Sequence, residues 1–290
     1  MRYAAPTTVD EAQSLLAEHP GSRVFAGATD LIPQIRAGRP APPVLVDLKR
    51  IDQLMTVIHE DGQWRIGAAT PTSNLTRNRD FTAMFPGLSE AMGLIGSDQI
   101  QNRSSLGGNL ANASPAADSV PAMIANAVQA VIASGDGTRT VPVAEIATGP
   151  GRTSLADGEF IIEFTVADPP SNTGDAYLRM IPRTEMDIAI VGAAVRLSVD
   201  GDIVTDATVV LGAVAPTAVT VPEAGAALVG AAIDAGSIDG SAMDTLADAA
   251  SAACDPIDDK RGTVAYRRKV AGVMARRAAA IAVGRAQNGV

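Results

Sequence analysis

The sequence predicts an α+β protein made of more than one folding unit. Its 290 residues exceed the usual size of a single domain, so we expect two or three units. Strand-like and helical patterns alternate up to about residue 167, and a polar stretch with two prolines then separates them from a second group of strands. Hydrophobic residues make up 47% of the chain and aromatic residues only 3%, which indicates a core of closely packed small aliphatic side chains.

Charge and cysteine content argue against several classes of function. The net charge of -9 opposes a general role in nucleic-acid binding, although local basic patches remain compatible with it. The single cysteine, Cys254, allows neither a disulfide nor an iron-sulfur or thiolate metal centre within the chain. The first residues contain no apolar signal core, and the longest uncharged stretch, residues 119–135, is interrupted by a proline and polar residues. We therefore expect no membrane span and a cytoplasmic location.

The first 50 residues predict a small βαβ-like unit. Thr8 and Glu11 have the spacing of a capping box, in which Thr8 caps a helix and Glu11 reaches back to the cap residue. A short strand ending at Phe25 or Ala26 precedes a helix that begins near Leu31, and "PVLVDL" (43–48) supplies the next strand.

A larger unit follows, with a strand over 64–68 and helices over 89–96 and 119–127. Further strands are predicted over 129–134, 138–143 and 159–166. The segment "ADPPSNTGDA" (167–176) has the composition of an exposed connection, so we place a domain boundary near residue 172.

The last part of the chain begins with a hairpin and ends in helices. Strands over 189–199 and 203–214 flank Asp200-Gly201, a dipeptide suited to a tight turn because both central positions tolerate positive φ. The Ala-rich remainder is helical in pattern, and its last segment, 266–286, predicts a packed terminal helix with a solvated basic face.

Two glycine-containing segments have the character of anion-binding loops. "AGATDL" (26–31) follows a strand and precedes a helix, and "SLGGN" (105–109) places Gly107 and Gly108 side by side. Clustered backbone amides bind a diphosphate without any cationic side chain, and glycines allow close approach. The alternatives are an ordinary turn capped by Thr29 or Asp30 for the first segment and a strained loop or hairpin turn for the second. Neither segment is a Rossmann or a Walker A motif.

Candidates for acid-base or metal chemistry are few. His19 and His59 are the only histidines, and the sequence supplies no third residue that would complete a triad with either. Asp258 and Asp259 form an acidic pair of a kind that an acidic chain contains by chance. We expect no catalytic residue and no metal site.

The order of the motifs resembles the flavin-bearing medium subunits of the molybdenum hydroxylases, which include carbon monoxide dehydrogenase and the flavin domain of xanthine dehydrogenase. The resemblance rests on "AGATD", "SLGGN" and "ASPAAD" (113–118) in succession, followed by "TRTVPVAEI" and "YLRMIPRTEMDIA". It implies a PCMH-type, or vanillyl-alcohol-oxidase-type, FAD-binding domain over 1–172, with subdomains of about 1–56 and 57–172. A C-terminal α+β domain of the carbon monoxide dehydrogenase flavoprotein type would occupy 173–290.

The resemblance also implies which residues bind FAD. The two loops would hold the diphosphate and nearby groups, Asp118 would lie on the ribose or adenine side, and Ile188 would cover one face of the isoalloxazine in place of the aromatic residue of several relatives. The implied FAD-binding residues are Val24, Phe25, Ala26, Gly27, Ala28, Thr29, Asp30, Leu31, Ile95, Ser105, Leu106, Gly107, Gly108, Asn109, Asp118, Ile162, Arg179 and Ile188.

Two positions depart from the family pattern. Ala28 replaces the second glycine of the first loop and matches its conformation only if its φ is negative, while Ser105 replaces a frequent threonine. No histidine lies in these motifs, so the FAD is expected to be bound noncovalently.

The function implied by the resemblance is electron transfer within an oxidoreductase complex. A large molybdopterin subunit would hydroxylate the substrate, a small subunit with two 2Fe-2S clusters would carry the electrons, and FAD in this chain would pass them to an external acceptor, a nicotinamide, a quinone or dioxygen. The assembly would be a dimer of heterotrimers. Two alternatives are a flavin-free interaction subunit, favoured only by Ala28, and a stand-alone FAD oxidoreductase.

Overall fold

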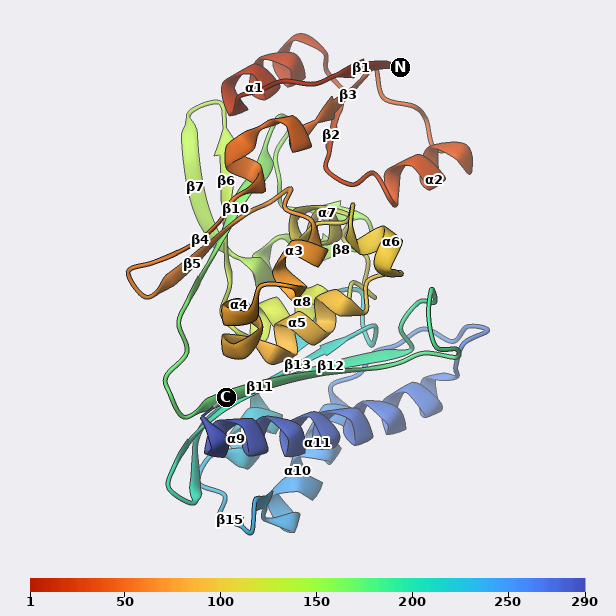
Figure 1. Cartoon of the computed structure of the whole chain (residues 1–290). Helices are drawn as coiled ribbons and strands as arrows, with labels where there is room; N and C mark the ends of the chain where they lie inside the picture. Colours follow the sequence, from red (N-terminus) through yellow and green to blue (C-terminus); the bar gives the residue numbers. More distant parts are fainter. Residues whose placement is uncertain (290) are drawn as a thin grey trace.

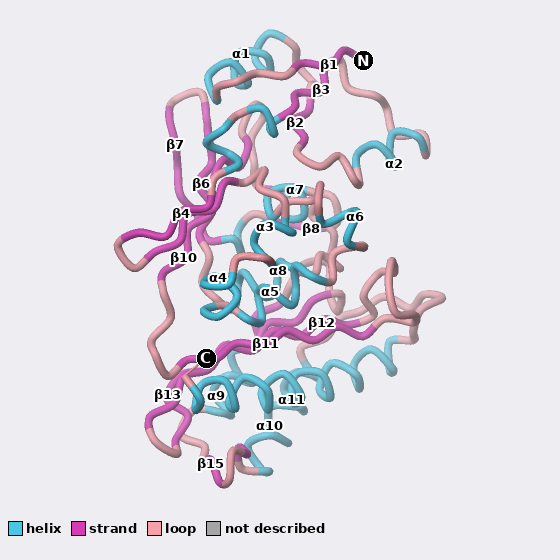
Figure 2. The backbone as a smooth tube through the Cα atoms, viewed as in Figure 1, coloured by secondary structure: helices cyan, strands magenta, loops and turns pink. Residues whose placement is uncertain are grey.

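The computed structural model describes residues 1–289 as three sheets with helices packed around and between them (Figure 1). The sheets have three, five and four strands, and two short two-stranded ribbons complete the strand content of this part of the chain. The mixture of sheets and helices confirms the predicted α+β class (Figure 2). Among the described residues, none of the helices combines the length and apolar character that crossing a bilayer requires.

The N-terminal unit is a parallel sheet with strand order β1-β3-β2. The central strand is buried along its whole length, and its Val44 and Val46 pack in one core with Ala12 of α1 and with Leu54 and Phe160 from the chain that follows. The elements are β1 (Arg2–Ala4), α1 (Val9–Glu18), β2 (Arg23–Phe25), α2 (Leu31–Arg36) and β3 (Val44–Asp47). The predicted strands and helices of this unit are therefore confirmed.

The cap of α1 differs from the prediction by one residue. The Thr8 hydroxyl accepts a hydrogen bond from the Glu11 amide at 3.2 Å, as expected. The Glu11 carboxylate, however, accepts from the amide of Thr7 at 2.7 Å and not from that of the cap residue.

The second unit is an antiparallel sheet with order β4-β5-β10-β6-β7 and a group of short helices against one side (Figure 1). Its core contains Trp64, Phe81 and Phe85, so the few aromatic residues gather here. The strands are β4 (Val57–Glu60), β5 (Gln63–Gly67), β6 (Gln129–Ser134), β7 (Gly137–Pro142), β8 (Ala147–Gly149), β9 (Arg152–Thr153) and β10 (Phe160–Ala167). The helices are α3 (Thr72–Thr76), α4 (Arg79–Met84), α5 (Pro86–Gly93), α6 (Asp98–Gln101), α7 (Leu106–Ala111) and α8 (Ser119–Ala125).

The third unit is an antiparallel sheet with order β11-β12-β13-β14, enclosed between helices. Helix α11 packs on one face, and α5 and α8 of the second unit pack on the other, which makes the sheet a middle layer (Figure 1). The elements are β11 (Thr173–Met180), β12 (Val191–Asp200), β13 (Ile203–Gly212), β14 (Val219–Thr220), α9 (Pro222–Leu228), β15 (Ile233–Asp234), β16 (Ser237–Ile238), α10 (Gly240–Ala252) and α11 (Val264–Asn288).

The hairpin between β12 and β13 is present, but its turn lies one residue later than predicted. Asp200 pairs with Ile203, so the two central residues are Gly201 and Asp202. Gly201 has a φ of +57°, and glycine at the first central position is typical of a type II′ turn. The sequence signal Asp-Gly instead marks the turn between β4 and β5, where Asp61 and Gly62 both have positive φ.

The terminal helix α11 is packed as predicted, except for one arginine. Its inner face consists mainly of alanines, which allow a close approach to the sheet and to α10, in keeping with the low aromatic content. Arg267, expected on the solvated basic face, is only 3% exposed. Its guanidinium donates to the carbonyl of Ile190 at 2.6 Å and to the carboxylate of Asp259 at 2.7 Å, so its charge is paired.

Strand β11 holds helix α5 through alternate residues. The Asp175 carboxylate accepts from the amides of Gly87 and Leu88, at 2.8 and 3.0 Å, at the start of the helix. The amide of Tyr177 donates to the Glu90 carboxylate at 3.1 Å. Burial raises the pKa of Asp175, while the hydrogen bond from Gly87 opposes that shift. These contacts join the second and third units.

The crossing of α10 and α11 gives a stability prediction. A Cβ on Gly272 would lie 2.5 Å from the carbonyl oxygen of Ala247, whereas a Cβ on Gly284 of the same helix meets nothing. Gly272→Ala should lower the free energy of unfolding by about 2 kcal/mol through overpacking. Gly284→Ala should raise it by up to about 1 kcal/mol through helix propensity. Urea unfolding followed by circular dichroism measures both, and an equal response of the two variants would contradict this packing.

Candidate functional site

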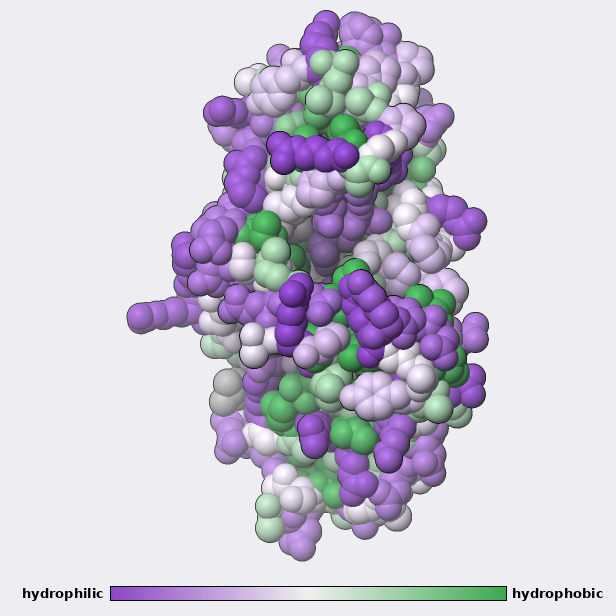
Figure 3. Space-filling model, turned by 90° about the vertical axis from the view of Figure 1, so that its right-hand side faces the viewer, coloured by the Kyte–Doolittle hydropathy of each residue, from purple (hydrophilic) through white to green (hydrophobic). Residues whose placement is uncertain are grey.

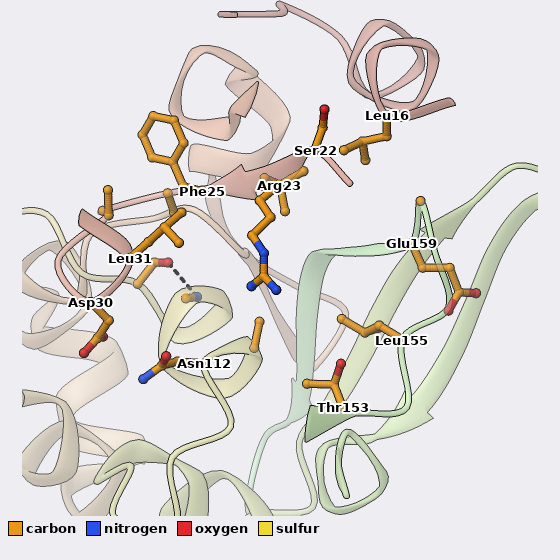
Figure 4. Close-up of a pocket in the computed structure, with 18 of the residues that line it drawn as sticks. Leu16, Ser22, Arg23, Phe25, Asp30, Leu31, Asn112, Thr153, Leu155 and Glu159 are labelled. Atoms are coloured by element: carbon orange, nitrogen blue, oxygen red, sulfur yellow. Dashed lines mark hydrogen bonds between the residues drawn. The ribbon is translucent and has the colours of Figure 1, made fainter. Parts of the chain in front are cut away.

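A cavity of about 860 Å³ lies between the N-terminal unit and the second unit. One wall runs from the end of α1 through β2 to α2, and the other is formed by α7 and by the segment from β9 to the start of β10. Figure 3 shows a hollow in the surface between the upper lobe and the middle of the molecule. Figure 4 shows side chains from both walls that point into this space. The cavity is large enough for a dinucleotide-sized ligand.

The first predicted loop, 26–31, lies directly against the segment that leads into α7. A Cβ on Gly27 would collide with the carbonyl group of Arg103, so only glycine permits this contact. The next residue corrects our expectation, because Ala28 has a φ of +58° and not a negative one. The alanine thus keeps the left-handed conformation that a glycine adopts easily, at a cost of about 1 kcal/mol.

The backbone amides of this loop are free to bind a ligand. Within residues 1–289, the amides from Gly27 to Leu31 donate no hydrogen bond to the chain. Asp30 is the N-cap residue of α2, but its side chain makes no capping hydrogen bond. The alternative of an ordinary turn capped by Asp30 is therefore not what the structure shows. Consecutive unpaired amides beside a cavity form an anion-binding cradle.

The second predicted loop is the start of a short helix, not a loop. Ser105 caps α7, and its hydroxyl accepts from the amide of Gly108 at 3.1 Å. The amide of Gly107 donates to the carbonyl of Ala68 at 3.1 Å, and a Cβ on Gly107 would lie 2.6 Å from that oxygen. Gly107 therefore packs the helix against the end of β5, while Gly108 lines the cavity. The glycines have different roles, and only one of them removes a side chain from the cavity wall.

Twelve of the residues predicted to bind the cofactor line this cavity. Asn109 among them is fixed by the hydroxyl of Ser119, which donates to its amide oxygen at 2.7 Å. The twelve are Val24, Phe25, Ala26, Gly27, Ala28, Thr29, Asp30, Leu31, Ile95, Ser105, Gly108 and Asn109. Leu106, Gly107, Asp118, Ile162, Arg179 and Ile188 lie outside it.

Asp118 and Arg179 form a buried ion pair between the second and third units. The Arg179 guanidinium donates to the Asp118 carboxylate and to the carbonyl of Leu94, both at 2.8 Å. Tyr177 donates its hydroxyl to the same carboxylate at 2.9 Å. Burial raises the pKa of Asp118 to about 6, although the positive charge of Arg179 opposes the shift. Because Leu94 precedes Ile95, Arg179 fixes the backbone beside the cavity wall.

The remaining predicted residues have separate surroundings. Leu106 is buried in the core of the second unit. Ile162 lies on β10, and its carbonyl accepts from the amide of Ala68 at 2.9 Å. Ile188 lies between β11 and β12 and is 52% exposed. Its side chain is accessible from outside the cavity.

Sequence reasoning missed the cationic and apolar side chains of the cavity. Arg23, Arg39, Gln34 and Asn112 supply its polar lining, and Arg23 projects into it from β2 (Figure 4). The cavity wall thus carries cationic side chains beside the backbone amides on which the sequence-based expectation rests. Arg23 stands in a short strand that is otherwise apolar, and this pattern could have indicated a cationic side chain at the site. Leu16 and Leu155 come from α1 and from the segment before β10, and no local pattern marks them.

Two further cations lie behind the first loop. The ammonium of Lys49 donates to the carbonyl of Ala69 at 2.5 Å. Loss of water lowers the pKa of Lys49 to about 8, and the positive charge of Arg103 adds to the shift. Arg103 is the residue whose carbonyl packs on Gly27. Two positive charges thus lie close together near this contact, while Asp47 offsets part of the charge at Lys49 and Asp30 belongs to the loop itself.

Neither histidine lines the cavity. The His59 ring stacks on Trp64 with a centroid distance of 4.4 Å, and its Nε2 lies 3.0 Å from both carboxylate oxygens of Asp168. Asp259 of the acidic pair is bound to Arg267. In the described part of the chain, no three His, Cys, Asp or Glu side chains are grouped to hold a metal ion.

Comparison with known proteins identifies the family. Residues 1–169 match the model of the FAD binding domain in molybdopterin dehydrogenase, and residues 176–282 match the CO dehydrogenase flavoprotein C-terminal domain. The chain is 34% identical over 288 residues to the carbon monoxide dehydrogenase medium chain of Afipia carboxidovorans, covering 99% of this chain and 98% of that protein. It is 30% identical over 217 residues to the xanthine dehydrogenase FAD-binding subunit of Escherichia coli O157:H7, with 74% of each chain covered.

A solved structure shows the same fold. The carbon monoxide dehydrogenase of Hydrogenophaga pseudoflava contains a chain that superposes with a TM-score of 0.93 at 34% identity, with 98% of both chains covered. The predicted PCMH-type architecture followed by a flavoprotein-type C-terminal domain is confirmed. The chain therefore belongs to the FAD-binding medium subunits of the molybdenum hydroxylases, a family of oxidoreductases.

Proposed function

We propose that the cavity between the first two units holds FAD noncovalently and that the chain passes electrons from a partner's iron-sulfur clusters to an external acceptor. The observation that carries this proposal is the run of unpaired amides from Gly27 to Leu31, which faces a cavity of about 860 Å³. Amides held by a rigid backbone bind a diphosphate without reorganisation. The bound flavin supplies the redox chemistry, and the chain supplies its position and surroundings.

The two loops have complementary tasks in this proposal. The first offers its amides, and Gly27 and Ala28 set their direction through a close contact and a positive φ. The second offers the open side of Gly108, where a Cβ would meet only the Ser105 hydroxyl at 3.3 Å. Both therefore leave room for the oxygens of a diphosphate at the main chain.

The flavin ring would lie toward the third unit. Ile95 borders the cavity, and the buried pair of Asp118 and Arg179 adjoins it through the carbonyl of Leu94. Ile188 lies on the third unit with 52% of its surface exposed, which suits a residue that covers one face of the ring while leaving an acceptor access to it. We propose Ile95, Asp118, Arg179 and Ile188 as the surroundings of the ring, so that Asp118 lies on the ring side and not on the ribose or adenine side that the resemblance implied.

The chain would work as one component of a complex. Its single cysteine cannot ligate a cluster, so a small 2Fe-2S subunit and a large molybdopterin subunit would supply the other centres. We propose a dimer of such heterotrimers in the cytoplasm, with a nicotinamide, a quinone or dioxygen as acceptor. The flavin-free alternative depended on Ala28, and this residue keeps the left-handed backbone that the loop requires.

Replacing Gly108 tests the site. Gly108→Asp should abolish FAD retention, because a carboxylate would lie beside the diphosphate. The helix itself should tolerate the change, since a negative charge in the first turn of α7 is favourable. The flavin absorbance per folded chain in the purified complex measures the effect.

Gly108→Ala is the matched control. Its methyl group meets only the Ser105 hydroxyl at 3.3 Å, so the variant should keep most of its flavin. Full flavin content in a folded Gly108→Asp complex would show that the diphosphate lies elsewhere.

The exposed position of Ile188 gives a prediction about the acceptor. Ile188→Tyr should narrow access to the ring and lower the rate of electron transfer to the acceptor by about 3-fold or more, while FAD affinity changes little. Reoxidation of the reduced complex by each acceptor, followed by stopped-flow absorbance, measures the rate. Unchanged rates with every acceptor would refute the proposed position of Ile188.

A further inference from the structure

The cavity continues beyond the two loops into an apolar compartment. Leu16, Ala17 and Pro20 line it on the side of the N-terminal unit, and Leu155 and Ala156 line it on the side of the second unit. The same segments also place Gln13, Ser22 and Asp157 on the cavity wall. In Figure 4, Leu16 and Leu155 lie on opposite sides of the space. Facing aliphatic side chains of this kind suit a flat, uncharged ring.

Arg23 occupies the space between this compartment and the loop amides. Its guanidinium extends from β2 toward the gap between α7 and Leu155 (Figure 4). Among residues 1–289 it has no ion pair and donates no hydrogen bond. Loss of water lowers the pKa of Arg23, and the positive charge of Arg39 lowers it further. An unpaired, partly desolvated cation at this place is stabilised by an anionic ligand.

The opposite wall is fixed in place by its own ion pair. The Glu159 carboxylate accepts from the Arg139 guanidinium at 2.7 and 2.8 Å, and also from the amide of Ala156 at 2.8 Å. The Arg139 hydrogen bonds lower the pKa of Glu159 to about 2. The Glu159 carboxylate is therefore already paired with Arg139. Asp30 and Asp157 also line the cavity, and within residues 1–289 neither forms an ion pair with Arg23.

We propose that Arg23 binds the diphosphate of the cofactor through its side chain and makes the site selective for adenosine diphosphate compounds over unphosphorylated flavin. The inference rests on the proposed FAD site. If the diphosphate of FAD lies between the loop amides and Arg23, its adenine ring reaches the apolar compartment. The amides and Arg23 then bind the anion, and the compartment binds the ring. An arginine holds two phosphate oxygens at once, which a single amide does not do.

The test uses the purified complex after removal of its flavin, titrated with FAD, ADP and riboflavin. Arg23→Gln should weaken FAD and ADP binding by about 10- to 100-fold, the range of a charged hydrogen bond, and riboflavin binding by less than about 2-fold. Flavin fluorescence measures FAD and riboflavin, and displacement of FAD measures ADP. Arg23→Lys should recover part of the loss, because it keeps the charge without the fork.

Salt dependence and a control variant separate this role from a structural one. FAD binding to the unmodified complex should weaken with salt, and Arg23→Gln should reduce that dependence. Arg36→Gln removes the same charge from the exposed end of α2, outside the cavity, and should leave all three affinities unchanged.

The outcomes distinguish an error in the proposed FAD site from an error in the role assigned to Arg23. If the unmodified complex fails to rebind FAD, the proposed FAD site is wrong. If it binds FAD but Arg23→Gln leaves the FAD and ADP affinities unchanged, the assignment of Arg23 is wrong while the site stands. Equal weakening of riboflavin and FAD would also overturn the assignment, because it would indicate a general distortion of the site.

Discussion

The contact of Gly27 with the backbone of Arg103 is the constraint on which the cavity depends. It joins the N-terminal unit to the second unit at a distance that excludes any Cβ, and a second such contact joins Gly107 to Ala68. Gly27 and Gly107 therefore serve main-chain packing, whereas Gly108 leaves the cavity wall free of a side chain. The first loop is held from behind at Gly27, and its amides from Gly27 to Leu31 have no partner within residues 1–289 while their residues line the cavity. An alanine at position 28 is tolerated, since the surrounding contacts fix its positive φ.

Local patterns were sufficient for most elements but not for their exact ends. In the cap of α1, the Glu11 carboxylate binds the amide of Thr7 in place of the neighbouring Thr8 amide, because the two amides are close in energy as partners. The turn after β12 lies one residue later than predicted, because two strand registers that differ by one residue are close in energy. Helix α7 was missed since two glycines give it a low intrinsic propensity. It forms because Ser105 caps it and because Gly107 packs against β5, and the second of these is a tertiary contact that no local pattern contains.

The candidate site, too, has a part that local motifs predict and a part that only the tertiary structure reveals. Its contiguous motifs, 24–31 and 105–109, were recognisable, and most of their residues line the cavity. Arg23, Asn112 and Leu155 belong to three separate segments that only the topology brings together. The acidic composition also gave no sign of the arginines in the cavity, because Arg23 and Arg39 line it together with Asp30, Asp157 and Glu159. Net charge describes the whole surface and says little about a single enclosed site.

The third unit is connected to the cavity through its strand β11 and helix α5 of the second unit. Asp175 binds the first amides of α5, the amide of Tyr177 binds Glu90 in its middle, and Arg179 binds the carbonyl of Leu94 just past its end. Four residues of strand span about 13 Å, and seven residues of helix span about 10 Å, so alternate positions of β11 can follow the length of α5. Ile95, the next residue, lines the cavity. A shift of the third unit along α5 would therefore move Ile95 and the cavity wall with it, so β11 links the packing of the third unit to the candidate site.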